Sequence, residues 1–214
     1  MLTTDFAALF NPALVGTALD GAIATWQAAN LTGPALARIA LIRSGAIANT
    51  EGVEVEFPNH ETRRLCAGES SIIAKAVIEE FARRFLTQPA VLWLSESAHK
   101  VVARDDLLAQ RIGLKIDAAK NLPDIILVDV GHADGAILVF VEVVATDGPI
   151  SDTRRAELLK VAQAANFPER HVAFVTAYLD RERPAARKTF PILAPNSFAW
   201  SASEPATIIS IFGG

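Results

Sequence analysis

The sequence predicts an α/β fold in which a helix, three strands, a helix and a strand follow one another, with a mixed sheet flanked by helices (αβββαβ). Residues 123–128 and 138–144 are strongly apolar and rich in β-branched side chains, as buried strands are. Residues 69–85 form an amphipathic stretch before these strands. A small, mainly helical region, residues 1–60, is expected to precede the larger domain, residues 61–214.

The first region carries two helical patterns and then a hairpin. Residues 14–29 and 33–47 have apolar side chains at the helical spacings of three and four. Residues 53–57 alternate strictly between apolar and polar, and Pro58 opens a turn, which predicts a β-hairpin. Helices followed by a hairpin resemble a small winged-helix-like module, and a helical cap on the larger domain is the alternative.

The larger domain begins with the helix at residues 69–85, for which Ser70 or Ser71 is a possible N-cap. The other expected elements are a strand at 91–94, a short helix at 105–111, the two apolar strands, a helix from Ser151 or Asp152 to about 165, a strand at 172–177, and closing strands at 198–200 and 207–211. This order gives the αβββαβ core.

Composition excludes several classes of protein. Hydrophobic residues make up 51% of 214, yet no apolar run reaches the roughly 18 residues of a membrane span. The first residues lack the basic and apolar segments of a signal peptide. Cys66 is the single cysteine, and a single cysteine excludes an internal disulfide and fits a reducing cytoplasm. We expect Cys66 to be buried.

Charge is distributed unevenly along the chain. The net charge is −4, which argues mildly against nucleic-acid binding. However, residues 116–150 hold a local charge of −5, and residues 151–190 hold a local charge of +3. An acidic metal centre beside a basic segment suits a protein that binds DNA phosphates.

Asp124 and Glu142 are the most informative side chains, because they lie on the two apolar strands, which a turn at residues 131–135 separates. A buried carboxylate costs several kcal/mol unless it is paired, protonated or bound to a metal. Two carboxylates brought together across a hairpin would bind a divalent metal. The alternative is that both acids are structural groups.

Five segments in register resemble BsuBI/PstI-type restriction endonucleases of the PD-(D/E)xK nuclease superfamily. They are residues 68–81, 122–129, 141–158, 174–177 and 198–200, within a match over about residues 65–214. In that superfamily a proline–aspartate pair and a second acid hold Mg²⁺, and a lysine usually follows two residues later. Val144 stands in the place of this lysine, as is typical of the family. Ser70 and Ser71 replace a His-Asn pair that the family often has.

The resemblance implies a type II restriction endonuclease that uses Mg²⁺ to hydrolyse double-stranded DNA at a specific site. It implies a homodimer in the cytoplasm, with a companion DNA methyltransferase. The residues expected to act are Asp124, Glu142 and Lys100 in catalysis, Asp124, Glu142 and Glu80 on the metal, and Arg154, Arg155 and Lys75 on DNA. The alternatives are a non-catalytic DNA-binding or scaffolding member of the same fold, and a small-molecule α/β enzyme.

Overall fold

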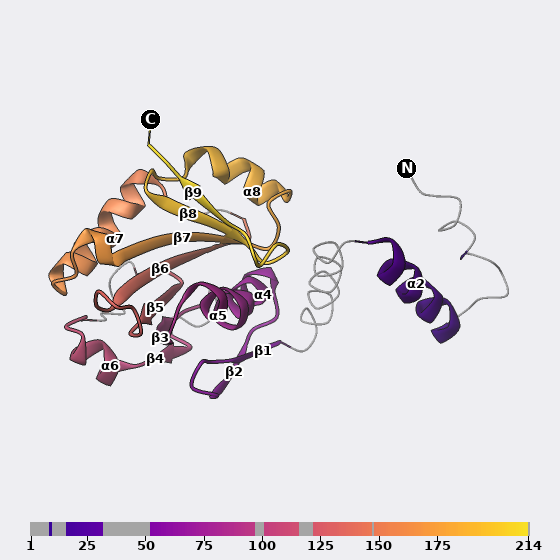
Figure 1. Ribbon diagram of the computed structural model, residues 1–214, viewed down its shortest axis with the longest axis horizontal. Helices are drawn as coiled ribbons and strands as arrows, with labels where there is room; N and C mark the ends of the chain where they lie inside the picture. Colours follow the sequence, from indigo (N-terminus) through magenta and orange to yellow (C-terminus); the bar gives the residue numbers. More distant parts are fainter. Residues whose placement is uncertain are drawn as a thin grey trace.

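The centre of the molecule is a seven-stranded mixed sheet, seen in a computed structural model that describes residues 9, 16–31, 52–96, 101–115, 122–146 and 148–213 (Figure 1). The strand order is β4-β3-β5-β6-β7-β8-β9. The strands are β3 (Pro89–Leu94), β4 (Ala103–Arg104), β5 (Ile125–Asp129), β6 (Ile137–Val144), β7 (Val172–Tyr178), β8 (Ser197–Ser201) and β9 (Ile208–Ile211). Strands β6, β7 and β8 are parallel, and the other pairings are antiparallel.

Helices cover both faces of this sheet. One face carries a single helix made of α4 (Glu69–Ala76), the π segment η1 (Val77–Phe81) and α5 (Ala82–Phe85). The remaining helical segments of the larger domain are α6 (Asp106–Arg111), α7 (Asp152–Ala164), η2 (Glu169–His171), α8 (Pro184–Thr189) and η3 (Phe190–Ile192). The order of α4, β3, β5, β6, α7 and β7 is the expected αβββαβ order, which confirms the predicted fold class.

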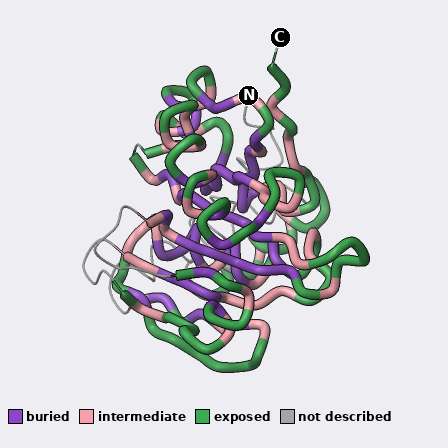
Figure 2. The backbone as a smooth tube through the Cα atoms, turned by 90° about the vertical axis from the view of Figure 1, so that its left-hand side faces the viewer, coloured by how far each residue is buried: buried purple, intermediate pink, exposed green. Residues whose placement is uncertain are grey.

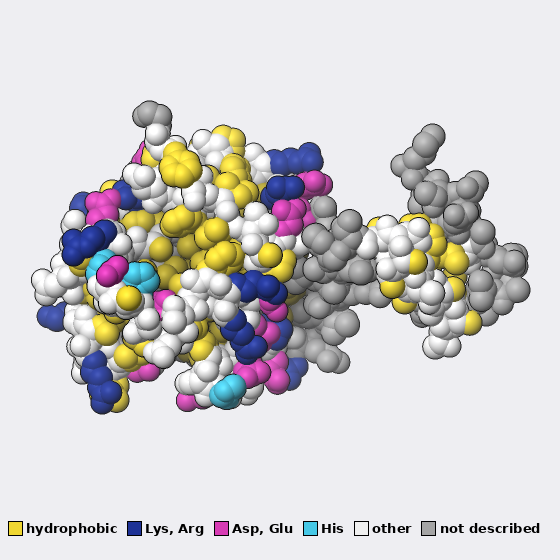
Figure 3. All heavy atoms as spheres, viewed as in Figure 1, with side chains coloured by type: hydrophobic (Ala, Val, Ile, Leu, Met, Phe, Trp, Pro, Cys, Tyr) yellow, Lys and Arg dark blue, Asp and Glu magenta, His cyan; other side chains and the backbone are white. Residues whose placement is uncertain are grey.

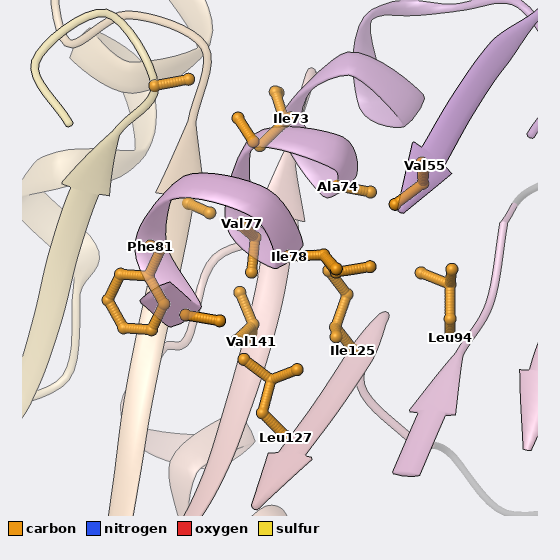
Figure 4. Packing of buried hydrophobic residues seen from close by; sticks show 14 of the residues in the cluster. Val55, Ile73, Ala74, Val77, Ile78, Phe81, Leu94, Ile125, Leu127 and Val141 are labelled. Atoms are coloured by element: carbon orange, nitrogen blue, oxygen red, sulfur yellow. The ribbon is translucent and has the colours of Figure 1, made fainter. Parts of the chain in front are cut away.

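Alternation along the central strands divides the core into two layers. Ile125, Leu127, Val139 and Val141 pack against the α4 helix. Figure 4 shows Ile125, Leu127 and Val141 beneath Val77 and Ile78. The residues between them, among which are Ile126 and Phe140, pack with Leu158 and Ala162 of α7. Figure 2 shows that the buried segments run through the interior of the molecule, with exposed segments at its outer edges. Residues with even numbers on β5 and β6 therefore face α7.

The helix at residues 69–85 differs from the prediction in two respects. Helix α4 starts directly after Gly68 without a side-chain cap, so the N-cap predicted for Ser70 or Ser71 is wrong. Ser71 is 4% exposed and lies inside the helix. The π segment η1 interrupts the regular turns, and it buries Val77, Ile78 and Phe81. A spacing of three and four residues cannot reveal such a wide turn.

The predicted hairpin is present, as β1 (Val53–Glu56) and β2 (Thr62–Leu65). Val53, Val55 and Leu65 join the cluster under α4, so the hairpin packs on the larger domain. Helix α2 (Thr17–Asn30) agrees with the first predicted helix. The second, at residues 33–47, lies outside the described residues.

Cys66 is exposed, so its predicted burial is wrong. It follows β2 at the end of the hairpin, where its backbone N–H donates to the Glu96 carboxylate at 2.8 Å. A small thiol side chain at a strand end beside a charged group is not forced into the core. None of the helices in the described ranges is long and apolar enough to span a membrane.

Candidate functional site

The structure brings Asp124 and Glu142 together. Asp124 directly precedes β5, Glu142 lies in β6, and the pairing of Ile125 with Val141 makes the two acids near neighbours on the α7 face. The two carboxyl groups are close enough to influence each other's protonation. The Val143 N–H donates to Asp124 Oδ2 at 2.8 Å. The strand register thus produces the pair that the sequence predicts.

The backbone that carries Asp124 is held from two sides. Three consecutive carbonyl groups accept hydrogen bonds: Leu122 from Arg154 Nη2 at 2.9 Å, Pro123 from Trp93 Nε1 at 2.9 Å, and Asp124 from the Ser95 N–H at 2.8 Å. Two of these donors follow or end β3, and the third lies on α7. Asp124 therefore has a fixed position although it stands just outside the strand.

Arg154 is the basic partner of the pair. Its Nε lies 2.6 Å from Glu142 Oε1, and the two side chains are only 15% and 9% exposed. Arg154 belongs to the first turn of α7, where the helix dipole disfavours a cation. From the sequence we expected a DNA phosphate as its anionic partner. In this structure Glu142 is an anionic partner, and Glu157 contributes a second, longer contact of 3.3 Å.

Thr176 fixes the start of α7 beside Glu142, and the sequence analysis did not identify it. It pairs with Glu142 in the β6–β7 register and is fully buried. Its Oγ1 accepts a hydrogen bond from the Ile150 N–H at 3.1 Å, just before the Ser151 N-cap. A single hydroxyl in the otherwise apolar segment 172–177 was the available signal.

Burial sets the proton affinity of the pair. Burial and the negative charge of Asp124 raise the pKa of Glu142, and Arg154 lowers it, with a net pKa of about 8. Burial also raises the pKa of Asp124, while the Val143 N–H lowers it. The pair therefore tends to hold one proton near neutral pH.

The proton that the pair holds leads to a testable prediction about how the stability of the fold depends on pH. The folded pKa of Glu142 lies above its value of 4.5 in an unfolded chain, so the folded protein binds more protons from about pH 4.5 to about pH 8. Stability should fall as the pH rises through this window. We expect Glu142→Gln to reduce the fall, as measured by urea unfolding at several pH values. Exposed Glu157→Gln is the control, and an unchanged slope in Glu142→Gln would contradict the assignment.

Glu80 and Lys75 lie on the helix that covers the opposite face of the sheet. Glu80 pairs with Arg84 at 2.9 Å. Lys75 Nζ donates to the Glu54 carbonyl at 2.6 Å and to Glu79 at 2.7 Å. No group of three or more His, Cys, Asp and Glu side chains forms a possible metal site in the part of the chain that the structure describes. The structure thus does not bring the expected third carboxylate, Glu80, to the acid pair.

The other two predicted residues have different outcomes. Arg155 pairs with Glu169 and lies over the Phe174 ring at 5.0 Å, so its side chain is only 17% exposed. Lys100 lies outside the described residues. On the face shown in Figure 3, basic and acidic side chains are intermixed and form no patch of one sign. Electrostatic attraction of DNA would therefore depend on local sites on this face.

The donor set of the pair suits a hard divalent cation. Mg²⁺ prefers oxygen ligands and is commonly held by one or two carboxylates together with several waters. Two carboxyl groups already in contact, one of them with a raised pKa, offer oxygen ligands once the shared proton leaves. A bound cation would also remove the repulsion between the ionised acids.

Comparison with known proteins concerns the family and the fold. A family model described as the BsuBI/PstI restriction endonuclease domain matches residues 53–214. The type II restriction enzyme BsuBI of Bacillus subtilis is 26% identical over 161 residues, which cover 75% of this chain and 48% of BsuBI. The chain thus spans about half the length of this relative. The solved SdaI restriction endonuclease has a similar fold, with a TM-score of 0.66 and 22% identity over 100% of this chain and 62% of SdaI.

Proposed function

This chain belongs to the BsuBI/PstI restriction endonuclease family, and from this premise we propose that it cuts double-stranded DNA at a specific site by Mg²⁺-dependent hydrolysis of phosphodiester bonds. The observation that carries the proposal is the buried carboxyl pair of Asp124 and Glu142, with Arg154 against it. A pair of acids with this cost of burial is retained more readily as a cation site than as a structural element.

Each residue of the site has a part in this proposal. Asp124 and Glu142 would hold the metal ion, which would supply a Lewis acid and an activated water when bound. The Val143 N–H orients Asp124, and Arg154 orients Glu142. Val144 packs with Tyr178 and Ala199, so no cation is supplied from its position. Negative charge that develops on the phosphate then requires a cation from elsewhere.

Lys100 is the residue that we propose for this task, because it follows the strand β3 that ends beside Asp124. We expect Lys100→Met to slow cleavage on the order of a hundredfold, as the loss of one charge-stabilising donor does in other enzymes. DNA affinity should change little, since many phosphate contacts share it. Cleavage at the normal rate would remove Lys100 from the mechanism.

The proposed function is tested most directly with supercoiled plasmid and phage DNA. Discrete fragments should form with Mg²⁺ and should be absent when EDTA removes the metal. Binding of DNA without any cutting would support the alternative, a non-catalytic DNA-binding or scaffolding protein. If the chain neither bound nor cut DNA, both functions would be contradicted.

The assembly around this activity is also proposed. A palindromic target would require two active sites related by a twofold axis, and hence a homodimer. A companion methyltransferase would protect the same target in the host DNA. The location that we propose for the protein is the cytoplasm. We further propose that, of the predicted region 1–60, the residues before β1 form a helical region that contacts DNA in the manner of a winged helix, while β1 packs on the larger domain.

A further inference from the structure

We propose that Arg154 exchanges partners during the reaction cycle: it binds Glu142 in the metal-free protein, and it turns to a DNA phosphate when a divalent cation occupies the acid pair. This inference rests on the proposed function, and it concerns how metal and DNA binding are coupled. It assigns Arg154 as a positioning residue for Glu142 and then as a DNA contact.

The charge of the site carries the first step. Without metal, Asp124, Glu142 and Arg154 together hold no net charge when the two acids share a proton, and one negative charge when both are ionised, so these side chains do not attract DNA. A divalent cation on the pair changes this total to one positive charge. A phosphodiester carries one negative charge, and it would neutralise that excess. The same three side chains thus do not attract DNA without metal and attract it when metal is bound.

The contacts of Arg154 carry the second step. The strong contact is the one to Glu142, at 2.6 Å between two largely buried side chains. The contact with Glu157 is longer, at 3.3 Å, and the Glu157 side chain is 49% exposed, so solvent can replace it. The hydrogen bond from Nη2 to the Leu122 carbonyl holds the guanidinium beside Asp124. Arginine has several N–H donors in a planar fork, which suits a phosphate once Glu142 is released.

The position of Arg154 carries the third step. It lies in the first turn of α7, a helix of 13 residues whose N-cap is Ser151. The helix dipole disfavours a cation there, and Glu142 offsets that cost in the metal-free protein. When a metal ion binds Glu142, that carboxylate no longer offsets the dipole cost in full. A phosphate beside the start of α7 would add negative charge at this helix end.

The exchange predicts an unusual effect on metal affinity. A fixed cation beside the pair opposes the arrival of a second cation, so Arg154→Met should bind Ca²⁺ more tightly than the unaltered chain, by about tenfold or more. Arg154→Lys, which keeps the charge, should bind Ca²⁺ much as the unaltered chain does. Isothermal titration of the full chain with Ca²⁺ gives these affinities without any cleavage.

A variant that merely damaged the site would bind Ca²⁺ more weakly, so the sign of the change separates the two explanations. Arg84→Met is the matched control, because Arg84 pairs with Glu80 on the helix that covers the opposite face of the sheet. It should leave Ca²⁺ affinity unchanged. Equal or weaker Ca²⁺ binding by Arg154→Met would overturn the exchange.

DNA binding gives the second readout. The affinity of the unaltered chain for labelled plasmid fragments should rise several-fold when Ca²⁺ is added, and this rise should be largely lost in Arg154→Met. An equal loss of DNA affinity with and without Ca²⁺ would mean that Arg154 serves DNA independently of the metal, which would overturn the exchange.

A direct measurement on the unaltered chain covers the case in which Arg154→Met does not fold. The Arg154 Nε–H resonance should shift when Ca²⁺ alone is added, because its hydrogen bond to Glu142 breaks. A Ca²⁺ titration that shifts nearby signals but leaves this one unchanged would overturn the exchange while the metal site stands. If Ca²⁺ did not bind at all, even though Asp124 and Glu142 were intact, both the exchange and the proposed metal-dependent function would fail.

Discussion

Asp124→Asn is expected to abolish cleavage and to leave the fold intact. Asparagine has nearly the size of aspartate, and its carbonyl oxygen can still accept the hydrogen bond from the Val143 N–H. The negative charge that would hold the metal is lost. Because a bound metal ion contributes several kcal/mol of charge stabilisation, and about 1.4 kcal/mol is a tenfold change in rate, the loss should be on the order of a thousandfold or more.

The folded state should not suffer from this substitution. Burial raises the pKa of Asp124, so its charged form is disfavoured in the fold, and the charge also repels Glu142. Thermal unfolding should therefore show an equal or higher midpoint for Asp124→Asn. Initial rates on plasmid DNA measure the other effect. Cleavage at the normal rate would show that the acid pair is not the active site.

Asp129→Ala is expected to have the opposite profile, with a large loss of stability. Asp129 ends the same strand, is 3% exposed, and accepts hydrogen bonds from the N–H groups of Thr87, Gln88 and Gly131 at 2.9, 2.8 and 3.0 Å. Alanine would leave these donors without their acceptor. At about 1–3 kcal/mol for each buried unsatisfied group, the free energy of unfolding should fall by roughly 3 kcal/mol or more.

The pH dependence of stability distinguishes the two ends of β5. Burial alone would raise the pKa of Asp129, but the three backbone donors outweigh it and hold the pKa below its ordinary value. This acid therefore stabilises the fold at neutral pH, and its contribution is lost as the pH falls through the folded pKa. Urea unfolding of Asp129→Ala should show a smaller loss of stability in acid than the unaltered chain. A fall of less than about 1 kcal/mol at neutral pH would contradict the structural role.

The two aspartates also show what the sequence could predict. The apolar run that forms β5 is evident, and an acid stands at each end of it. The sequence could predict that Asp124 lies beside Glu142. Strand alternation and the pairing of two consecutive strands both depend on residues that are close in sequence. The expectation for Glu80 did not hold, since the face that its helix covers depends on a chain crossover that spacing does not reveal. Glu80 instead pairs with Arg84, four residues along the same helix.

Arg154 was recognised from the sequence only as a cation in need of an anion. The position of α7 depends on a hydrogen bond from Ile150 to Thr176 of the next strand, a contact between residues 26 positions apart. Such contacts depend on the packing of whole elements, and propensity and local spacing contain no record of them. The predicted caps at Ser70 and Ser71 were wrong for a related reason, because burial of Ser71 removed it from the helix end.

The three carbonyl groups that fix Asp124 also determine when the site can form during folding. Their donors are Ser95, Trp93 and Arg154, separated in sequence from their acceptors by 29, 30 and 32 residues. Each contact closes a long loop of chain. Contacts of this kind slow folding, because the chain loses the entropy of loop closure before the contact stabilises it. Helices such as α7 can form earlier, from neighbouring residues. Asp124 and Glu142 should therefore reach their final geometry only when β3, β5 and α7 have docked, so regain of activity after denaturation should lag behind regain of helical structure.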